Sequence, residues 1–334
     1  MRYINKKKKQ NRILLIFMMM VVIAMMVVSC QSVDHRTIAA DNIRAYELQH
    51  FNRSLMRQTM FAANLAVTTT DVGMGDFTLS PDIYAALLVD VNNRSVLYGK
   101  NLFASLYPAS TTKLMTAYLT FRYGNLEDMV TVSERAVAFD WTVQLGGFQA
   151  GDTVSLFDLL CGMILHSGND NSVAIAEHIA GSEEAFVQLM NEEAKRIGAT
   201  RTTFVNSHGL HDANQVTTAY DLYLIFNVLL QDQRFVDIIQ MPYHTAQVTD
   251  VHGNVRPITS FPTNWYTGGL IGNPYNVSVL GGKTGTTDQA GACVILLNRD
   301  INNRSFISII MGAPSRDVLY ENMTNMLHYG INNR

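Results

Sequence analysis

Cysteine and proline are scarce in this sequence, and each shortage excludes a class of protein. The 334 residues include only three cysteines and seven prolines. So few cysteines exclude a disulfide-stapled scaffold, and no histidine and cysteine residues have the spacing of a metal site. Cys161 and Cys293 lie in apolar segments, which predicts small buried side chains. The few prolines give no sign of long disordered linkers, so we expect a globular protein. Because no metal-site spacing is found, we also expect that this protein needs neither metal nor cofactor.

Acidic residues are absent from the start of the chain. The first one is Asp34, whereas residues 1–12 contain six basic side chains. An apolar run of 16 residues follows at 13–28, which is shorter than the about 20 residues of a membrane-spanning helix. This order of basic, apolar and small residues resembles a secretory signal peptide. We therefore interpret residues 1–30 as a targeting segment outside the folded body.

Residues 27–30 read Val-Val-Ser-Cys and resemble the lipobox of bacterial lipoproteins, although Val27 stands where leucine is preferred. This resemblance implies that Cys30 is the site of lipid attachment. The alternative is an uncleaved membrane anchor. Both interpretations place the rest of the chain outside the cytoplasm, tethered to the bacterial cell membrane.

The body of the chain is mildly acidic, which argues against a nucleic-acid partner. The full sequence has a formal charge of −3, and from Cys30 onward 19 basic and 28 acidic residues leave −9. Proteins that bind nucleic acid carry basic surfaces that neutralise phosphates. The lysines near the start belong to the targeting segment.

Strand-like patterns occupy both ends of the body, and helix-like patterns occupy its middle. Asn92-Asn93 marks a turn between two strands of a hairpin that starts at Tyr84. Helices are expected at 42–67, 110–122, 155–166, 169–180, 182–197, 218–231 and 315–330. Further strands are expected at 243–251, 254–260, 277–281, 291–298 and 304–312. We predict an α+β fold, with one antiparallel β-sheet packed by helices and an inserted all-helical lobe.

Three short motifs stand in order along the body. They are Ser-Thr-Thr-Lys at 110–113, Ser-Gly-Asn at 167–169 and Lys-Thr-Gly at 283–285. Each motif alone is uninformative, because a serine often caps a helix and a lysine often faces solvent. The ordered set resembles the signature of serine β-lactamases and penicillin-binding proteins, in which the second motif is commonly Ser-Asp-Asn.

The first two motifs contain residues for nucleophilic catalysis. Ser110 and Lys113 are one helical turn apart, so their side chains share a face. We expect Ser110 to be the nucleophile and Lys113 the base that takes its proton. Burial and a second cation, Lys283, are expected to lower the pKa of Lys113 so that it can act as a base. Ser167 is expected to relay a proton to the leaving amine, and Asn169 to hold the substrate backbone.

The third motif is expected to bind the end of the substrate. Lys283 and Thr284 offer hydrogen bonds to a carboxylate. Gly285 is expected to leave room where an extended substrate approaches the strand. The backbone N–H groups of Ser110 and Thr286 are expected to form the oxyanion hole.

Longer stretches resemble the serine D-Ala-D-Ala carboxypeptidases, the low-molecular-mass penicillin-binding proteins. The likeness runs over residues 84–330 and is densest at 108–120, 151–210 and 281–296. It implies a serine β-lactamase/transpeptidase-like fold and removal of the terminal D-Ala from peptidoglycan stem pentapeptides through an acyl-enzyme on Ser110. It also implies that β-lactam antibiotics acylate the same serine.

The resemblance also sets domain limits and leaves related functions open. It implies a catalytic domain over residues 81–334. We interpret residues 31–80, which end in a Thr- and Gly-rich stretch, as a spacer between the anchor and that domain. Transpeptidation stays open because Lys-Thr-Gly-Thr-Thr, at 283–287, is also common in transpeptidases. An endopeptidase of peptidoglycan is a further alternative. A β-lactam or muropeptide sensor without turnover usually carries further transmembrane helices, whereas this sequence offers one short apolar segment.

Two other hydrolase mechanisms are disfavoured by what the sequence lacks. A class A β-lactamase uses a glutamate to activate the deacylating water, and no glutamate stands between Glu193 and Glu321. A Ser-His-Asp triad is disfavoured because no serine stands in a Gly-x-Ser-x-Gly elbow, although His166, His208 and His211 are available.

Overall fold

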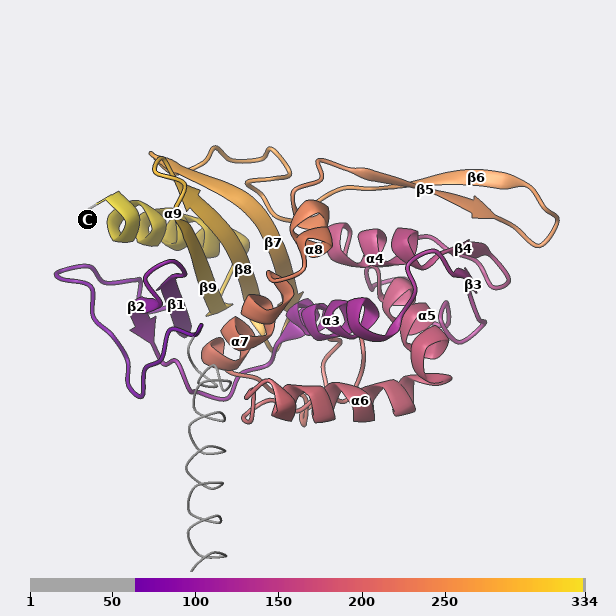
Figure 1. The fold of residues 1–334 in the computed structure, drawn as a ribbon, viewed down its shortest axis with the longest axis horizontal. Helices are drawn as coiled ribbons and strands as arrows, with labels where there is room; N and C mark the ends of the chain where they lie inside the picture. Colours follow the sequence, from indigo (N-terminus) through magenta and orange to yellow (C-terminus); the bar gives the residue numbers. More distant parts are fainter. Residues whose placement is uncertain (1–63, 333–334) are drawn as a thin grey trace, which may run out of the picture. The chain divides into compact units, whose positions relative to one another are not determined.

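A five-stranded antiparallel sheet joins the two ends of the folded body, in the order β2-β1-β9-β8-β7 (Figure 1). Its strands are β1 (Ala85–Asp90), β2 (Ser95–Lys100), β7 (Val277–Thr287), β8 (Gly291–Asp300) and β9 (Ser305–Ala313). The computed structural model describes residues 64–332. The expected signal peptide, its lipobox and Cys30 lie outside the described residues.

Both faces of this sheet are buried, as β1 shows most clearly. Its Leu87 and Val89 side chains enter the core shared with the helical lobe, whereas Ala86 and Leu88 enter a second core. Successive side chains of a strand point to opposite faces, so a strand covered on both sides is apolar throughout. Helix α9 (Arg316–Asn332) packs over the second face.

The helical lobe is inserted between β2 and β7. It consists of the 3-10 turn η1 (Ala109–Thr112) and helices α3 (Lys113–Tyr123), α4 (Leu156–Leu165), α5 (Asn169–Ala180), α6 (Glu183–Arg196), α7 (Ala219–Leu229) and α8 (Gln233–Ile239). Helix α3 is buried from Lys113 to Thr120 because it contacts α4, α5, α6 and α7. The predicted α+β class and the inserted helical lobe are therefore confirmed.

Capping residues explain where some of these helices begin or end. Ser155 accepts a hydrogen bond from the N–H of Asp158 at the start of α4, and Ser182 accepts one from Ala185 at the start of α6. These serines satisfy backbone donors that the first helical turn leaves unpaired. Gly181, with φ of 80°, ends α5 in the left-handed conformation that glycine adopts easily.

The predicted strands at 243–260 form, but not in the main sheet. They are β5 (His244–Thr249) and β6 (Val255–Ser260), and they join β3 (Met129–Thr131) and β4 (Thr153–Ser155) in a second sheet of order β3-β4-β5-β6. Figure 1 shows the β5–β6 hairpin extending along α4. The prediction of a single sheet is therefore wrong. Strands β3 and β4 have three residues each, which is too short to show the two-residue alternation by which a strand is recognised in a sequence.

Three other boundaries differ from the predictions. Helix α8 was not expected, since its seven residues follow α7 closely and are too few for a clear helical period. Strand β7 continues past residue 281 to Thr287, although Gly281 and Gly282 interrupt its apolar pattern. Residues 64–67, the end of a helix expected from residue 42, form a turn and coil, and the rest of that helix lies outside the described residues.

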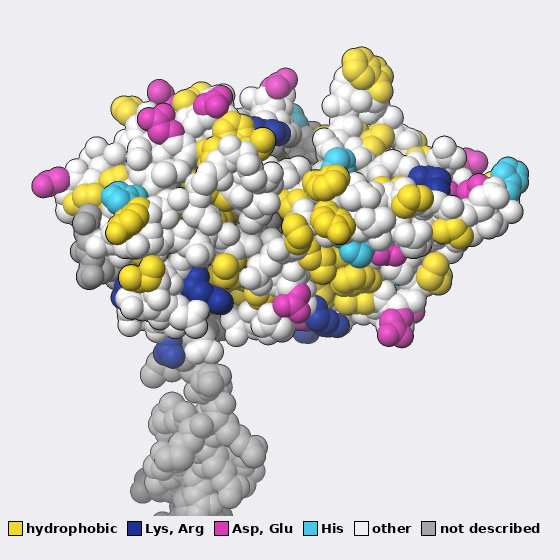
Figure 2. Space-filling view, turned by 90° about the horizontal axis from the view of Figure 1, so that it is seen from above, with side chains coloured by type: hydrophobic (Ala, Val, Ile, Leu, Met, Phe, Trp, Pro, Cys, Tyr) yellow, Lys and Arg dark blue, Asp and Glu magenta, His cyan; other side chains and the backbone are white. Residues whose placement is uncertain are grey.

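Two surface properties bear on partners. Figure 2 shows basic and acidic side chains scattered over one face, without a continuous basic patch. Within residues 64–332, no helix has the length and apolar character required to cross a membrane.

Candidate active site

The three motifs meet at one place in the fold. Ser110 lies in η1 and Lys113 is the first residue of α3, so the two side chains are one turn apart. Asn169 begins α5, and its Oδ1 atom lies 2.8 Å from the Nζ atom of Lys113. Lys283, inside β7, places its Nζ atom 2.8 Å from the Oγ atom of Ser167. The structure thus assembles these five predicted site residues between η1, two helix termini and β7.

The amine of Lys113 is fully buried and has three partners. Its Nζ atom lies 3.1 Å from the Oγ atom of Ser110, 2.8 Å from Oδ1 of Asn169 and 2.5 Å from the backbone oxygen of His208. The two amide oxygens only accept hydrogen bonds, so they take two N–H groups of the amine. In the neutral amine this leaves the lone pair directed at the Ser110 hydroxyl, as a general base requires.

Burial makes the neutral form of Lys113 accessible. The pKa of Lys113 lies well below its usual value, chiefly because burial disfavours the charged amine and also because Lys283 is a nearby cation. The charge of Asp170 acts in the opposite direction and is weaker. Both causes expected from the sequence, burial and Lys283, are confirmed.

Lys283 is a second buried amine, contributed by β7. Its Nζ atom also donates to the backbone oxygen of Thr284, 3.0 Å away. Burial, followed by the positive charge of Arg316, lowers the pKa of Lys283 to about 7. Arg316 begins α9 and was not singled out from the sequence, where a lone exposed arginine resembles any surface charge.

Two non-glycine residues next to the motifs have positive φ. Ala109 precedes Ser110 with φ of 47°, and Ser167 has φ of 70°. Such conformations cost about 1–3 kcal/mol each and tend to occur at functional sites. Gly168 is needed beside Ser167, because a Cβ atom there would lie 2.1 Å from the Oδ1 atom of Asn171.

Gly285 allows a close approach, but of the protein itself. A Cβ atom at this position would lie 2.9 Å from the backbone nitrogen of Ser110 and 3.0 Å from that of Thr111. The sequence interpretation gave this space to substrate, whereas the structure fills it with the turn that carries Ser110. Through this contact the backbone N–H of Ser110 lies against β7 at Gly285. The next residue of the strand, Thr286, is exposed.

We predict that Gly285→Ala destabilises the protein by about 1–3 kcal/mol, since overpacking a close contact moves backbone atoms apart. Gly272→Ala is the matched control, because a Cβ atom there meets nothing within 4 Å. Chemical denaturation of both variants measures the difference. Equal stability of the two variants would show that β7 does not need this glycine.

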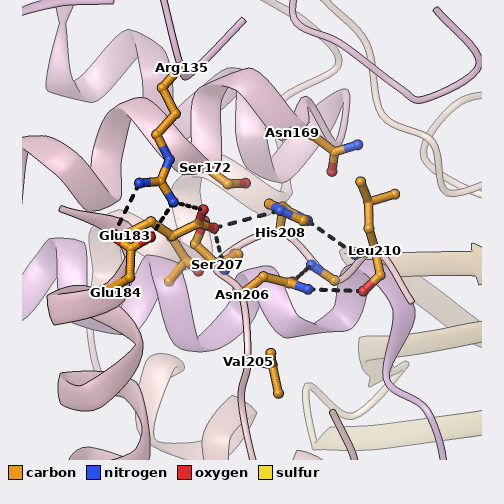
Figure 3. A network of polar contacts seen from close by, with 12 residues as sticks. Arg135, Asn169, Ser172, Glu183, Glu184, Val205, Asn206, Ser207, His208 and Leu210 are labelled. Atoms are coloured by element: carbon orange, nitrogen blue, oxygen red, sulfur yellow. Dashed lines mark hydrogen bonds and ion pairs between the residues drawn. The ribbon is translucent and has the colours of Figure 1, made fainter. Parts of the chain in front are cut away.

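The three histidines do not form a triad with Ser110 in the described chain. The Nε2 atom of His166 contacts the side-chain amide of Gln144 at 2.5 Å. His208 contributes its backbone oxygen to Lys113, and its ring faces Glu183 (Figure 3). His211 packs edge-on against the ring of Tyr107. Within residues 64–332, no group of three or more His, Cys, Asp or Glu side chains is arranged to hold a metal ion. The His208 oxygen was missed from the sequence because a backbone carbonyl leaves no signature there.

Comparison with known proteins gives a consistent result. A model of the D-alanyl-D-alanine carboxypeptidase family matches residues 78–315. The D-alanyl-D-alanine carboxypeptidase DacC of Escherichia coli is 32% identical over 286 residues, covering 83% of this chain and 66% of DacC. The D-alanyl-D-alanine carboxypeptidase DacA of Haemophilus influenzae is 32% identical over 253 residues, covering 74% of this chain and 61% of DacA. The chain thus spans less than two thirds of the length of these two relatives.

Solved structures show the same fold. The DD-transpeptidase of Streptomyces K15 superimposes with a TM-score of 0.70, at 22% identity, over 76% of this chain and 99% of that protein. The predicted resemblance of the fold to serine transpeptidases is therefore confirmed.

Proposed function

Because this chain belongs to the D-alanyl-D-alanine carboxypeptidase family, we propose that it removes the terminal D-Ala from peptidoglycan stem pentapeptides through an acyl-enzyme on Ser110. One observation carries this proposal. The buried amine of Lys113 lies 3.1 Å from the Ser110 hydroxyl and has two carbonyl oxygens as its other partners. That arrangement activates a serine without histidine.

Acylation follows from this geometry. The Oγ atom of Ser110 attacks the carbonyl carbon of the penultimate D-Ala while its proton passes to the Nζ atom of Lys113. The negative oxygen of the tetrahedral intermediate accepts hydrogen bonds from the backbone N–H groups of Ser110 and Thr286. The C–N bond then breaks, and the departing D-Ala amine takes the proton that Lys113 had accepted from Ser110, passed on through the hydroxyl of Ser167, which Lys283 holds in place.

Deacylation completes the cycle with water as the acceptor. Lys113, neutral again after it has given up its proton, takes a proton from the water that attacks the ester carbonyl. The C–O bond to Ser110 breaks and the serine recovers its proton. Asn169 holds the amide of the acyl group beside the amine that it also orients.

The β7 edge is assigned to the free carboxylate of the substrate. Lys283 offers a buried ammonium, Thr284 a hydroxyl, and Arg316 a further positive charge nearby. Thr263 pairs with the Thr284 hydroxyl across 2.6 Å and so orients it. A carboxylate at this edge places the preceding peptide bond in the cleft beside Ser110.

The low pKa of Lys283 predicts a pH-dependent KM. Below about pH 7 Lys283 is charged and attracts the carboxylate, whereas above it the amine loses its proton. We therefore expect KM to rise as the pH increases from 6 to 9, although a bound carboxylate shifts the transition upward. Steady-state kinetics across this range measure the effect. Lys283→Arg, which keeps its charge, should show a flat KM, and a flat KM in the unsubstituted protein would contradict the assignment.

The defining experiment is release of D-Ala. Incubating the protein with diacetyl-Lys-D-Ala-D-Ala should liberate free D-Ala, detected by chiral chromatography. Stable penicillin labelling of Ser110 without D-Ala release would instead identify a sensor that does not turn over.

Transpeptidation is the second candidate function. It is supported by the Lys-Thr-Gly-Thr-Thr stretch at 283–287 and by the fold shared with a protein named a DD-transpeptidase. Adding an amine acceptor to the same assay distinguishes the two reactions. Amide formation faster than hydrolysis would establish the transferase.

We expect β-lactams to acylate Ser110 and the resulting acyl-enzyme to hydrolyse slowly. No glutamate stands between Glu193 and Glu321, and Glu193 itself is held by Arg196 and Tyr123. This part of the chain therefore supplies no glutamate to activate a deacylating water.

The membrane tether is proposed from sequence alone. The lipobox-like residues 27–30 support a lipid on Cys30, on a protein that acts outside the cytoplasm with residues 81–334 as its catalytic domain. A Cys30→Ala variant should lose lipid labelling and membrane association. Unchanged processing of that variant would favour an uncleaved anchor.

A further inference from the structure

A network of polar contacts joins Glu183 to Ser207 and His208 (Figure 3), and the backbone oxygen of His208 is a partner of Lys113. We propose that Glu183 is a positioning residue for the base, because it fixes the backbone of Ser207, next to His208, whose carbonyl oxygen holds the amine of Lys113. The inference rests on the proposed role of Lys113 and extends it to a residue that touches neither substrate nor nucleophile.

Glu183 makes two hydrogen bonds to Ser207, the first residue of the segment 207–210. Oε1 of Glu183 accepts hydrogen bonds from the backbone N–H of Ser207 at 2.9 Å and from its hydroxyl at 2.7 Å. The Glu183 side chain is only 12% exposed. Two charge-assisted bonds to one oxygen in a buried position hold the backbone of the segment firmly.

The same segment is tied to α3 from the opposite side. Thr116, one turn after Lys113, donates its hydroxyl to the backbone oxygen of Ser207 at 2.6 Å. Gly209 packs so closely that a Cβ atom there would lie 2.0 Å from the backbone oxygen of Ala109. A shift of this segment would therefore disturb both the base and the turn that carries Ser110.

The ring of His208 supports the same arrangement. Its Nδ1 atom accepts a hydrogen bond from the N–H of Leu210 at 3.1 Å, so the proton of the neutral ring is on Nε2. The Nε2 atom faces Oε1 of Glu183 at 3.6 Å. Burial and the charge of Lys113 lower the pKa of His208 to about 3, which keeps the ring neutral. The neutral ring of His208 thus helps to hold the segment in place and does not act as a base instead of Lys113.

The neighbouring Glu184 provides a matched control. It forms an ion pair with Arg135 at 2.6 Å and is 65% exposed. Arg135 also reaches Glu183, at 3.5 Å. Glu184→Ala therefore removes a carboxylate that lies in the same first turn of α6 and pairs with the same arginine. Both hydrogen bonds between Glu183 and Ser207 stay in place.

The test measures the acylation rate and the initial binding of a fluorescent penicillin separately, by stopped flow. We expect Glu183→Ala to slow acylation roughly 10- to 100-fold, as misplacement of a catalytic group does, with initial binding changed less than about threefold. Glu183→Gln, which keeps an acceptor for Ser207, should stay within about threefold of the native rate. Glu184→Ala should acylate at the native rate.

The outcomes separate this inference from the proposed function. If the unsubstituted protein is not acylated, the proposed function fails. If it is acylated and Glu183→Ala acylates equally fast, only the positioning role fails. Equal loss in the Ala and Gln variants would also overturn it, since charge and not hydrogen bonding would then matter. If Glu183→Ala does not fold, Ser207→Ala, which removes one of the two bonds, should still slow acylation, and a native rate there would overturn the inference.

Discussion

Replacing Ser110 with alanine is expected to abolish both D-Ala release and covalent labelling by penicillin. The hydroxyl oxygen is the atom that forms the acyl bond, and Lys113 Nζ is its hydrogen-bond partner. Without that oxygen no covalent intermediate forms, although the cleft still binds substrate. Intact-protein mass spectrometry after incubation with penicillin should show no added mass.

Ser105→Ala is the control for this experiment, because Ser105 is exposed and lies five residues before the nucleophile. It should label as the unsubstituted protein does. Labelling of the Ser110→Ala variant at any other serine would show that the nucleophile has been misassigned.

Replacing Lys113 with methionine is expected to slow acylation about 10²- to 10⁴-fold, the range for loss of a general base. Methionine fills a similar buried volume but carries no lone pair for the Ser110 proton. In the unsubstituted protein the acylation rate should rise with pH as Lys113 loses its proton. Because the pKa of Lys113 is depressed, this rise should occur well below pH 10.5.

The pH profile distinguishes a base from a structural lysine. The methionine variant should lose the rise, while its circular dichroism spectrum and unfolding temperature report that it still folds. Acylation of this variant within tenfold of the native rate would remove Lys113 from the mechanism.

The sequence predicted the motif residues of the site, which form its inner part, better than the residues that surround them. Ser110 and Lys113 share a face by helical spacing alone, and that prediction needed no knowledge of the fold. That Ser167 and Lys283 belong to the same site came from the family resemblance, because local patterns do not report contacts between distant segments, and their direct hydrogen bond was not predicted. The catalytic roles of these residues remain predictions for the variants above.

The outer part of the site could not be read from residue patterns. The carbonyl oxygen of His208 belongs to the backbone, which is the same at every position. Glu183 stands in the first turn of α6, where acidic residues favour the helix dipole whether or not they have another task. The second sheet escaped prediction for a related reason, since its β3 and β4 strands are too short to be recognised.

The strand order has a consequence for how the protein is made. Strand β1 pairs with β2, which follows at once, and with β9, which lies near the other end of the chain. Pairings so distant in sequence form slowly. The ribosome releases Ser110 and Lys113 long before β7, the strand that carries Lys283 and presses against the nucleophile's turn. A growing chain therefore holds Ser110 in an unfinished site. If Ser110 is the nucleophile that we propose, we expect acylation only after the last strands have been added, so penicillin labelling should report completed folding.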